Sequence, residues 1–199
     1  FGTLFRIGQT KNSGWYGEIS FKKSIGKDNS MAQALTPMGK KMNMIMPYAM
    51  QPGDGSSSLV LGLTNTRDLK EGMIWGTQLK RKMVVSESSW SFGDQTEFNS
   101  WIQYPFSKQV SISSRFKLID QDALSGSNPL IMAPVQTANP KNYGGTEAFL
   151  GLGININLDI SPGGNDSIGI EILKPVDQNK NNLQMKTDHQ VIIGYQKSF

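Results

Sequence analysis

The chain lacks cysteine, has a single histidine and contains no long apolar run. Without cysteine, neither a disulfide nor a thiolate metal site can contribute to the fold. Apolar runs are as short as residues 44–46 and 83–85, whereas a membrane-spanning helix needs about 20 consecutive apolar residues. A helical membrane protein is therefore excluded.

Strong charge of one sign is also missing. The 20 basic and 16 acidic side chains leave a net charge of +4 and are scattered along the sequence, so no nucleic-acid partner is expected. Only 37% of the residues are hydrophobic, which is typical of a soluble protein. A β-barrel membrane protein is compatible with this value, because every second side chain of its strands faces a polar interior. The informative signal is therefore alternation along the chain.

Alternation is clearest near the C-terminus. Between residues 148 and 160 every second residue is alanine, leucine or isoleucine, and most of the intervening residues are glycine, asparagine or aspartate. A turn-forming stretch follows at residues 161–166, after which Ile168, Ile170 and Ile172 resume the apolar series. This pattern predicts a β-hairpin.

The same pattern predicts three more hairpins and a final strand. The hairpins join residues 1–7 to 15–21, residues 59–64 to 73–80, and residues 97–106 to 110–118, and the last strand covers residues 190–199. Short connections alternate with long loops, which are expected at residues 26–57, 86–95, 120–144 and 176–188. Outer-membrane barrels pair short periplasmic turns with long extracellular loops, whereas a soluble sandwich has no reason to keep this order.

The last predicted strand ends on an aromatic residue, Phe199, with Tyr195 on the same face. Bacterial outer-membrane barrels commonly end in such a strand, which their assembly machinery recognises, so Tyr195 and Phe199 are the candidate assembly signal. The alternative is an ordinary edge strand of a soluble sandwich. If Phe199 lies at the periplasmic rim, the long loops are extracellular.

These observations predict an all-β fold, with residues 1–199 forming a single antiparallel transmembrane β-barrel domain in the bacterial outer membrane. About nine strands are visible of about ten to twelve expected, since bacterial barrels have an even strand number. Counting back from Phe199 places Phe1 at the outer rim, so one or three N-terminal strands are predicted to be missing. The expected partners are the lipid bilayer, the barrel-assembly machinery and a surface partner on the long loops.

The face opposite the apolar series carries many charged and amide side chains. In a barrel they project into the lumen, where they either line a hydrated channel or pair with one another and fill it. The candidate lumen residues are Arg6, Glu18, Lys22, Lys80, Lys82, Glu97, Asn99, Arg115, Lys117, Asn155, Asn157 and Glu171, and Gln78, Gln103, Asp159 and Gln196 share their face.

Residues that could carry chemistry are few. His189 could serve a hydrolase only with Asp188 and a serine, and no sequence feature places a serine beside it, so we favour a loop histidine and predict no enzyme activity. Methionines are concentrated in the first long loop, where thioethers could bind Cu(I) or fill gaps in the packing. The candidate copper ligands are Met42, Met44, Met46 and Met50. No other metal and no cofactor is predicted.

A family resemblance rests on this same loop. The sequences PMGKKM at residues 37–42, MPYAMQPGDGS at residues 46–56 and LGLT at residues 61–64 resemble motifs of outer-membrane transporters related to the meta-pathway phenol-degradation proteins. The stretches at residues 75–76, 92–101 and 139–145 are similar to later parts of that family. Ala49 departs from the pattern, which usually has proline there. The resemblance covers about residues 14–199 and implies an outer-membrane barrel.

Two function classes follow from the sequence. The first is an outer-membrane channel or transporter for small molecules, hydrophobic or aromatic ones among them, with the loop at residues 26–57 folding over or into the mouth. The second is a structural or partner-binding barrel with a plugged lumen. A soluble β-sandwich binding module is a third, weaker alternative.

Overall fold

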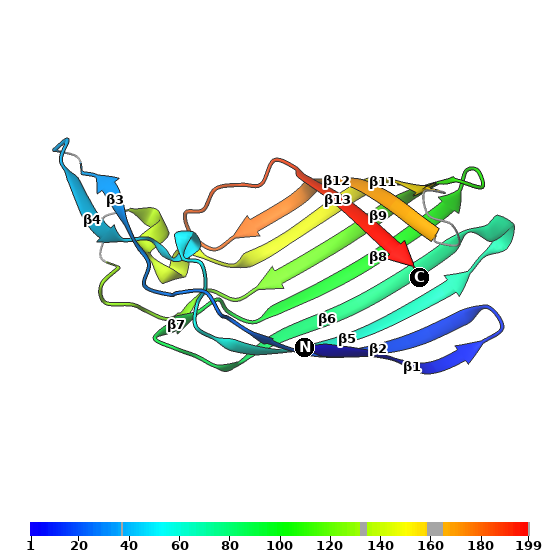
Figure 1. The fold of residues 1–199 in the computed structure, drawn as a ribbon, viewed down its shortest axis with the longest axis horizontal. Helices are drawn as coiled ribbons and strands as arrows, with labels where there is room; N and C mark the ends of the chain where they lie inside the picture. The colour runs from blue at the N-terminus through cyan, green and yellow to red at the C-terminus, as the bar shows by residue number, and fades with distance from the viewer. Residues whose placement is uncertain (37, 132–134, 159–164, 199) are drawn as a thin grey trace.

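The computed structural model describes residues 1–36, 38–131, 135–158 and 165–198. In this part of the chain nine strands form one sheet in the order β1-β2-β5-β6-β8-β9-β11-β12-β13, with antiparallel neighbours (Figure 1). Their bounds are β1 (Gly2–Thr10), β2 (Ser13–Lys23), β5 (Ser57–Asp68), β6 (Ile74–Ser86), β8 (Gln95–Pro105), β9 (Val110–Gln121), β11 (Gly145–Leu158), β12 (Asn165–Lys180) and β13 (Gln190–Ser198).

The connections add short elements to this sheet. Two pairs of short strands are β3 (Met31–Leu35) with β4 (Lys41–Ile45), and β7 (Trp90–Ser91) with β10 (Ser125–Gly126). Four single-turn 3₁₀ helices are η1 (Tyr48–Met50), η2 (Lys70–Gly72), η3 (Gln136–Ala138) and η4 (Pro140–Asn142). Among the described residues no helix is both long and apolar enough to cross a membrane.

The predicted strands are confirmed, because a period of two is what a half-buried strand imposes on a sequence. One boundary is wrong: β12 continues to Lys180, so the loop expected from residue 176 begins later. The pairing of β11 with β12 shifts between Ala148 and Phe149. Ala148 pairs with Asp177 and Phe149 with Pro175, so Val176 has no partner on β11. This bulge accommodates a proline inside the strand, which the sequence pattern alone would read as a strand end.

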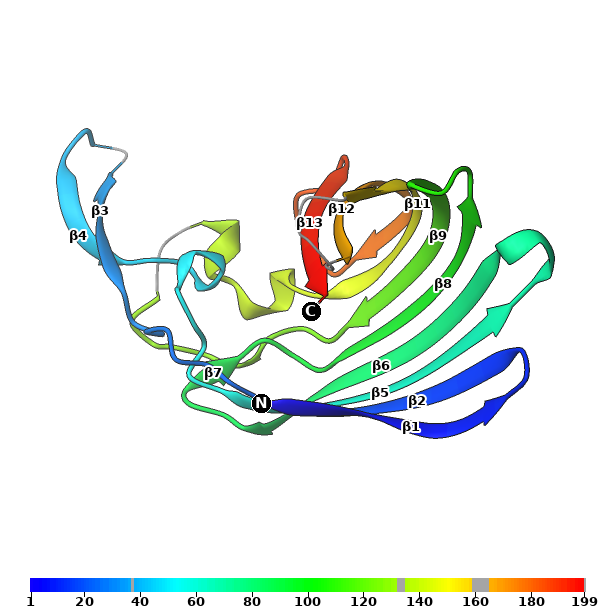
Figure 2. The ribbon, with the colours of Figure 1, turned by 45° about the vertical axis from the view of Figure 1, so that its right-hand side comes forward.

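The sheet is strongly curved and open. Figure 2 shows it curling round so that β12 and β13 come over the middle of the sheet, while β1 and β13 form its two edges. The described residues therefore form a curved wall of nine strands, the number predicted, and do not close into the expected barrel.

The two ends of the sheet differ. The tight turns after β1, β5 and β8 lie at one end, and the long connections after β2, β6, β9 and β12 lie at the other (Figure 1). This is the alternation that the sequence predicts. The turn expected at residues 161–166 lies largely outside the described residues, as does Phe199.

One face of the sheet is apolar and exposed. Leu152 and Ile193 are 72% and 71% exposed, and leucines and isoleucines of most other strands share this face. No second sheet covers it in the described part of the chain, so the packing of two apolar faces that defines a β-sandwich is missing. Four exposed aromatic side chains of this face lie toward the short-turn end: Trp15, Trp75, Tyr104 and Tyr195.

The opposite face lies on the inside of the curve. Asn99 and Phe149 on this face are 3% and 0% exposed although the structure has a single main sheet, so the inward curl and neighbouring side chains must cover them. We call this the concave face and its apolar counterpart the convex face.

Candidate functional site

The strand register places all twelve candidate lumen residues on the concave face. Going from strand to strand, Glu18 pairs with Gly62, Gly62 with Lys80, and Lys80 with Glu97, and Lys22, Lys82 and Asn99 follow at even spacings along these strands. The registers of β1, β9, β11 and β12 place the other six on the same face: Arg6, Arg115, Lys117, Asn155, Asn157 and Glu171. Gln78, Gln103 and Gln196 share this face, whereas Asp159 lies outside the described residues. That the face lines a lumen stays a prediction.

Most charges on the concave face are paired with a partner of opposite sign. The pairs are Lys80 Nζ to Glu18 Oε2 at 3.0 Å, Arg115 Nε to Glu171 Oε1 at 2.6 Å, Lys117 Nζ to Glu97 Oε2 at 3.2 Å and Lys180 Nζ to Glu147 Oε1 at 2.9 Å. Six of these eight side chains belong to the predicted set, and Glu147 and Lys180 were missed. Partly buried pairs of this kind limit the net charge of the concave face and cross-link the strands.

Two of the pairs reach over an intervening strand. Glu18 of β2 and Lys80 of β6 meet above Gly62 of β5, where an added Cβ would lie 3.1 Å from the Glu18 Cβ. Arg115 and Glu171 likewise meet across β11, next to Gly151. Glycine favours both contacts because an added side chain would crowd the space that the ion pair occupies.

The long loops form a small core of their own at one end of the sheet. Tyr48 of η1 and Trp90 of β7 are buried, with ring centroids 4.8 Å apart in an edge-to-face arrangement. Tyr143 packs against Tyr48, and Phe92 packs against both Trp90 and Tyr143. Leu124 and Ile131 complete what we call the loop core. It joins three connections that are far apart in the sequence.

Hydrogen bonds fix the loop core in place. The Tyr48 hydroxyl accepts from the Asn128 backbone N–H, and the Tyr143 hydroxyl accepts from that of Ala49. The buried Gln51 amide donates to the Met46 carbonyl and accepts from the Ser30 N–H. Within the motif at residues 46–56, Tyr48, Ala49 and Gln51 therefore hold the loop together.

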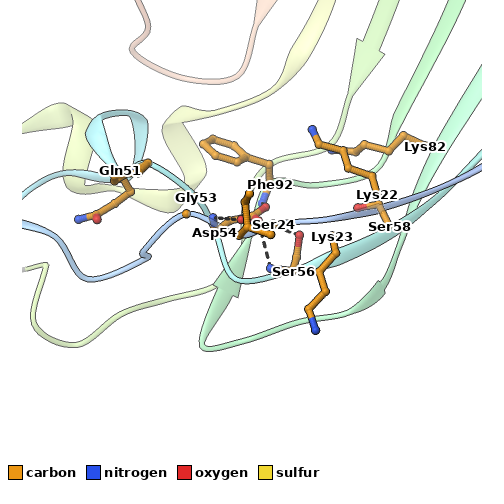
Figure 3. A pocket seen from close by; sticks show the side chains of 13 residues that line it. Lys22, Lys23, Ser24, Gln51, Gly53, Asp54, Ser56, Ser58, Lys82 and Phe92 are labelled. Carbon is orange, nitrogen blue, oxygen red and sulfur yellow. Dashed lines mark hydrogen bonds between the residues drawn. The ribbon is translucent and has the colours of Figure 1, made fainter. Parts of the chain in front are cut away.

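A cavity of about 350 Å³ lies between the loops and the sheet (Figure 3). It is lined by Lys22, Lys23, Ser24, Ile25, Gly26, Gln51, Pro52, Gly53, Asp54, Ser56, Ser58, Lys82 and Phe92. Asp54 accepts hydrogen bonds from the Ser56 N–H and hydroxyl and from the Phe92 N–H. Burial acts to raise the pKa of Asp54, but these hydrogen bonds outweigh it and hold the pKa below its ordinary value. Of the cavity residues, sequence analysis named Lys22 and Lys82 as candidate lumen residues. The stretches at residues 46–56 and 92–101, which supply six others, carried the family resemblance but no site assignment.

The methionine-rich loop contains a hairpin that sequence analysis missed. Met42 and Met44 share one face of β4 opposite Ala34 and Ala32 of β3, and the hairpin extends away from the sheet (Figure 2). Met46 follows β4, and Met50 ends η1. The described residues include no group of three or more histidine, aspartate or glutamate side chains suited to a metal. Copper binding by the thioethers stays a prediction.

His189 lies in the loop before β13. Its Nδ1 is 2.8 Å from Asp188 Oδ2, and both side chains are largely exposed. No other side-chain hydrogen bond to His189 occurs in the described ranges, so no serine joins the pair there. The absence of enzyme activity stays a prediction, as does the assembly signal, of which the structure describes only the exposed Tyr195.

Comparison with solved structures identifies the class of fold. The chain is similar to OmpT, an outer-membrane protein of Vibrio cholerae solved in its trimer form, with a TM-score of 0.50 and 7% sequence identity. The match covers 98% of this chain and 55% of OmpT, so the chain spans about half the length of that structure. The curved antiparallel sheet is therefore similar in fold to about half of that β-barrel.

No protein-family model matches the chain, and no curated protein does. The comparisons thus support an outer-membrane barrel fold and do not support membership of the phenol-degradation family.

Proposed function

We propose that this protein is a channel or transporter-like barrel for small molecules in the bacterial outer membrane. The observation that carries the proposal is the contrast between the two faces of one curved sheet. In the described ranges the convex face is apolar, exposed and covered by no second layer, whereas the concave face holds charged and amide side chains. In an outer-membrane barrel the lipid and the aqueous interior impose this division.

The distribution of aromatic residues supports a bilayer as the partner of the convex face. Trp15, Trp75, Tyr104 and Tyr195 lie on that face toward the short-turn end. Aromatic side chains form girdles where a barrel crosses from hydrocarbon to headgroups, because their rings combine an apolar body with a polar tip. On this proposal the short turns are periplasmic, the loop core is extracellular, and the barrel-assembly machinery inserts the protein.

A plugged barrel that binds a surface partner is the second candidate function. It is favoured by the loop core, in which buried Tyr48 and Trp90 join three long connections at one end of the sheet. The paired charges of the concave face could also fill a narrow interior instead of lining a pore. The hairpin of β3 and β4, with Leu35 and Met38 exposed, would then be available to a partner.

Single-channel recording of the full-length protein in planar bilayers separates the two functions. A channel predicts discrete ion currents that appear only after insertion of the folded protein. A plugged barrel predicts silence, and silence would overturn the channel proposal provided that the protein is shown to be folded and inserted. Removal of the loops at residues 24–56 and 122–144 would then test whether they are the plug.

A further inference from the structure

Two lysines on the concave face have no carboxylate partner, although the four glutamates of that face are all paired. Each of these glutamates forms an ion pair with a lysine or arginine side chain: Glu18, Glu97, Glu147 and Glu171. Lys22 of β2 and Lys82 of β6 form no ion pair within the described ranges. Both lysines lie at the loop end of the sheet and line the cavity of Figure 3.

The strand register explains why these lysines come together. Glu18 and Lys80 are opposite each other across Gly62, and on the next positions of the same face Ser20 and Lys82 flank Val60. Lys22 follows two residues after Ser20. Toward the loops, the concave face thus changes from an ion pair, Glu18 with Lys80, to two lysines of like charge, Lys22 and Lys82. Lys22 is near enough to repel Lys82 electrostatically.

The two carboxylates that act on Lys82 electrostatically, those of Asp54 and Asp94, are engaged elsewhere. Asp54 is held by Ser56 and Phe92, and Asp94 accepts from the Val84 N–H and pairs with Arg81 at 3.1 Å. Two like charges brought together without a partner cost free energy, which an anion placed between them would remove.

The rest of the cavity complements an organic anion. Ser58 is 4% exposed, and its hydroxyl has no hydrogen-bond partner in the part of the chain that the structure describes, so it is free to donate. Phe92 presents an aromatic ring that is held by Trp90 and Tyr143, and Ile25 adds a second apolar side chain. A cavity of about 350 Å³ is at the small end of the range for small-molecule sites.

We propose that this cavity binds a small organic carboxylate, with the carboxylate group between Lys22 and Lys82 and the apolar part against Phe92. The Ser58 hydroxyl donates to the same carboxylate. This inference rests on the proposed function and names its substrate class: the site holds an anionic solute where the loop end of the concave face begins.

Benzoate is a suitable probe, because it combines one carboxylate with one small apolar ring. In planar bilayers containing the full-length protein, benzoate should reduce the KCl current in a saturable manner. Benzyl alcohol, which has the ring without the charge, and inorganic phosphate, which has charge without an apolar part, should block at least about tenfold more weakly. Equal block by benzyl alcohol or by phosphate would overturn the assignment to organic carboxylates.

Matched variants locate the site. The double substitution Lys22→Gln and Lys82→Gln should raise the half-blocking benzoate concentration by about tenfold or more, because two charge-assisted contacts are lost. The control substitutes Lys40→Gln and Lys41→Gln together, because this removes the same two charges from exposed positions that do not line the cavity. A loss of block in the control equal to that in the double variant would place recognition elsewhere and overturn the proposal.

A binding measurement separates failure of this inference from failure of the channel function. Isothermal titration calorimetry of the refolded protein in detergent with benzoate does not depend on current. Binding that is lost in the double variant and kept in Lys82→Arg supports the site even if the bilayers are silent. Currents without benzoate binding would leave the channel intact and refute the carboxylate site.

Discussion

Truncation of Trp90 to alanine should loosen the three long loops while leaving the sheet folded. Trp90 is fully buried and stacks edge-to-face on Tyr48 and Phe92, with ring centroids 4.8 and 5.4 Å away. Replacing a buried tryptophan by alanine costs roughly 3 to 5 kcal/mol. The indole N–H has no hydrogen-bond partner among the described residues, so its removal offsets about 1 kcal/mol of this loss.

The net destabilisation of the loop core is therefore about 2 to 4 kcal/mol, which raises its opening equilibrium by about 30- to 1,000-fold. Hydrogen exchange with mass spectrometry measures this directly, because backbone amides exchange through local opening. Amides at residues 24–56, 87–94 and 122–144 should exchange faster in the variant, and those of β5, β6 and β8 should not change.

Phe106→Ala is the matched control, since Phe106 is 72% exposed and lies at the short-turn end. Its exchange pattern should be that of the unmodified protein. If Trp90→Ala accelerated exchange equally in the loops and the sheet, the loops would not form a separable core, and unchanged loop exchange would show that the aromatic stack does not hold them.

Two further outcomes follow from single positions. Gly62→Val should lower the free energy of unfolding by about 1 to 3 kcal/mol in urea titrations in detergent, since its Cβ would lie 3.1 Å from that of Glu18 and crowd the pair with Lys80. Gly8→Val, whose Cβ would meet no atom within 4 Å, should change the free energy of unfolding little. If both variants lost the same free energy of unfolding, crowding of the ion pair at Gly62 would not be the cause. Hydrogen bonds hold the pKa of Asp54 below 3.8, so its contribution to loop stability is present above that pH and is lost as the pH falls through the lowered value. Loop exchange, corrected for its intrinsic pH dependence, should accelerate over this acid range, and Asp54→Asn should abolish that acceleration. An acid response that persists in the variant would assign it to another group.

The strands of the sheet could be predicted from the sequence because burial of one face imposes a period of two. The series from Ala148 to Leu158 shows this directly, and its register with β9 and β12 follows from keeping the apolar residues on one face. The same period of two predicted that the charged residues share the opposite, concave face. Which of them pair was not predictable, since the contact between Arg115 and Glu171 depends on Gly151 and on the curvature of the sheet.

The loop structure could not be predicted, because it carries no periodic pattern. Trp90, in a two-residue strand, and Tyr48, in a single helical turn, are joined by packing between segments about 40 residues apart. The hairpin of β3 and β4 was missed for a related reason. Its strands have only five residues each, and the alternation of Lys41, Met42, Asn43 and Met44 in β4 breaks off at Ile45 and Met46.

Site-directed spin labelling of β11 tests the central claim most directly, and the absence of native cysteine makes each label unique. Leu152 lies on the convex face and Asn155 on the concave face of the same strand. In lipid vesicles, a label at Leu152→Cys should be accessible to oxygen dissolved in the bilayer, and one at Asn155→Cys to a water-soluble nickel chelate. If the nickel chelate reached both labels equally, the convex face would not lie in lipid and the account of an outer-membrane barrel wall would be contradicted.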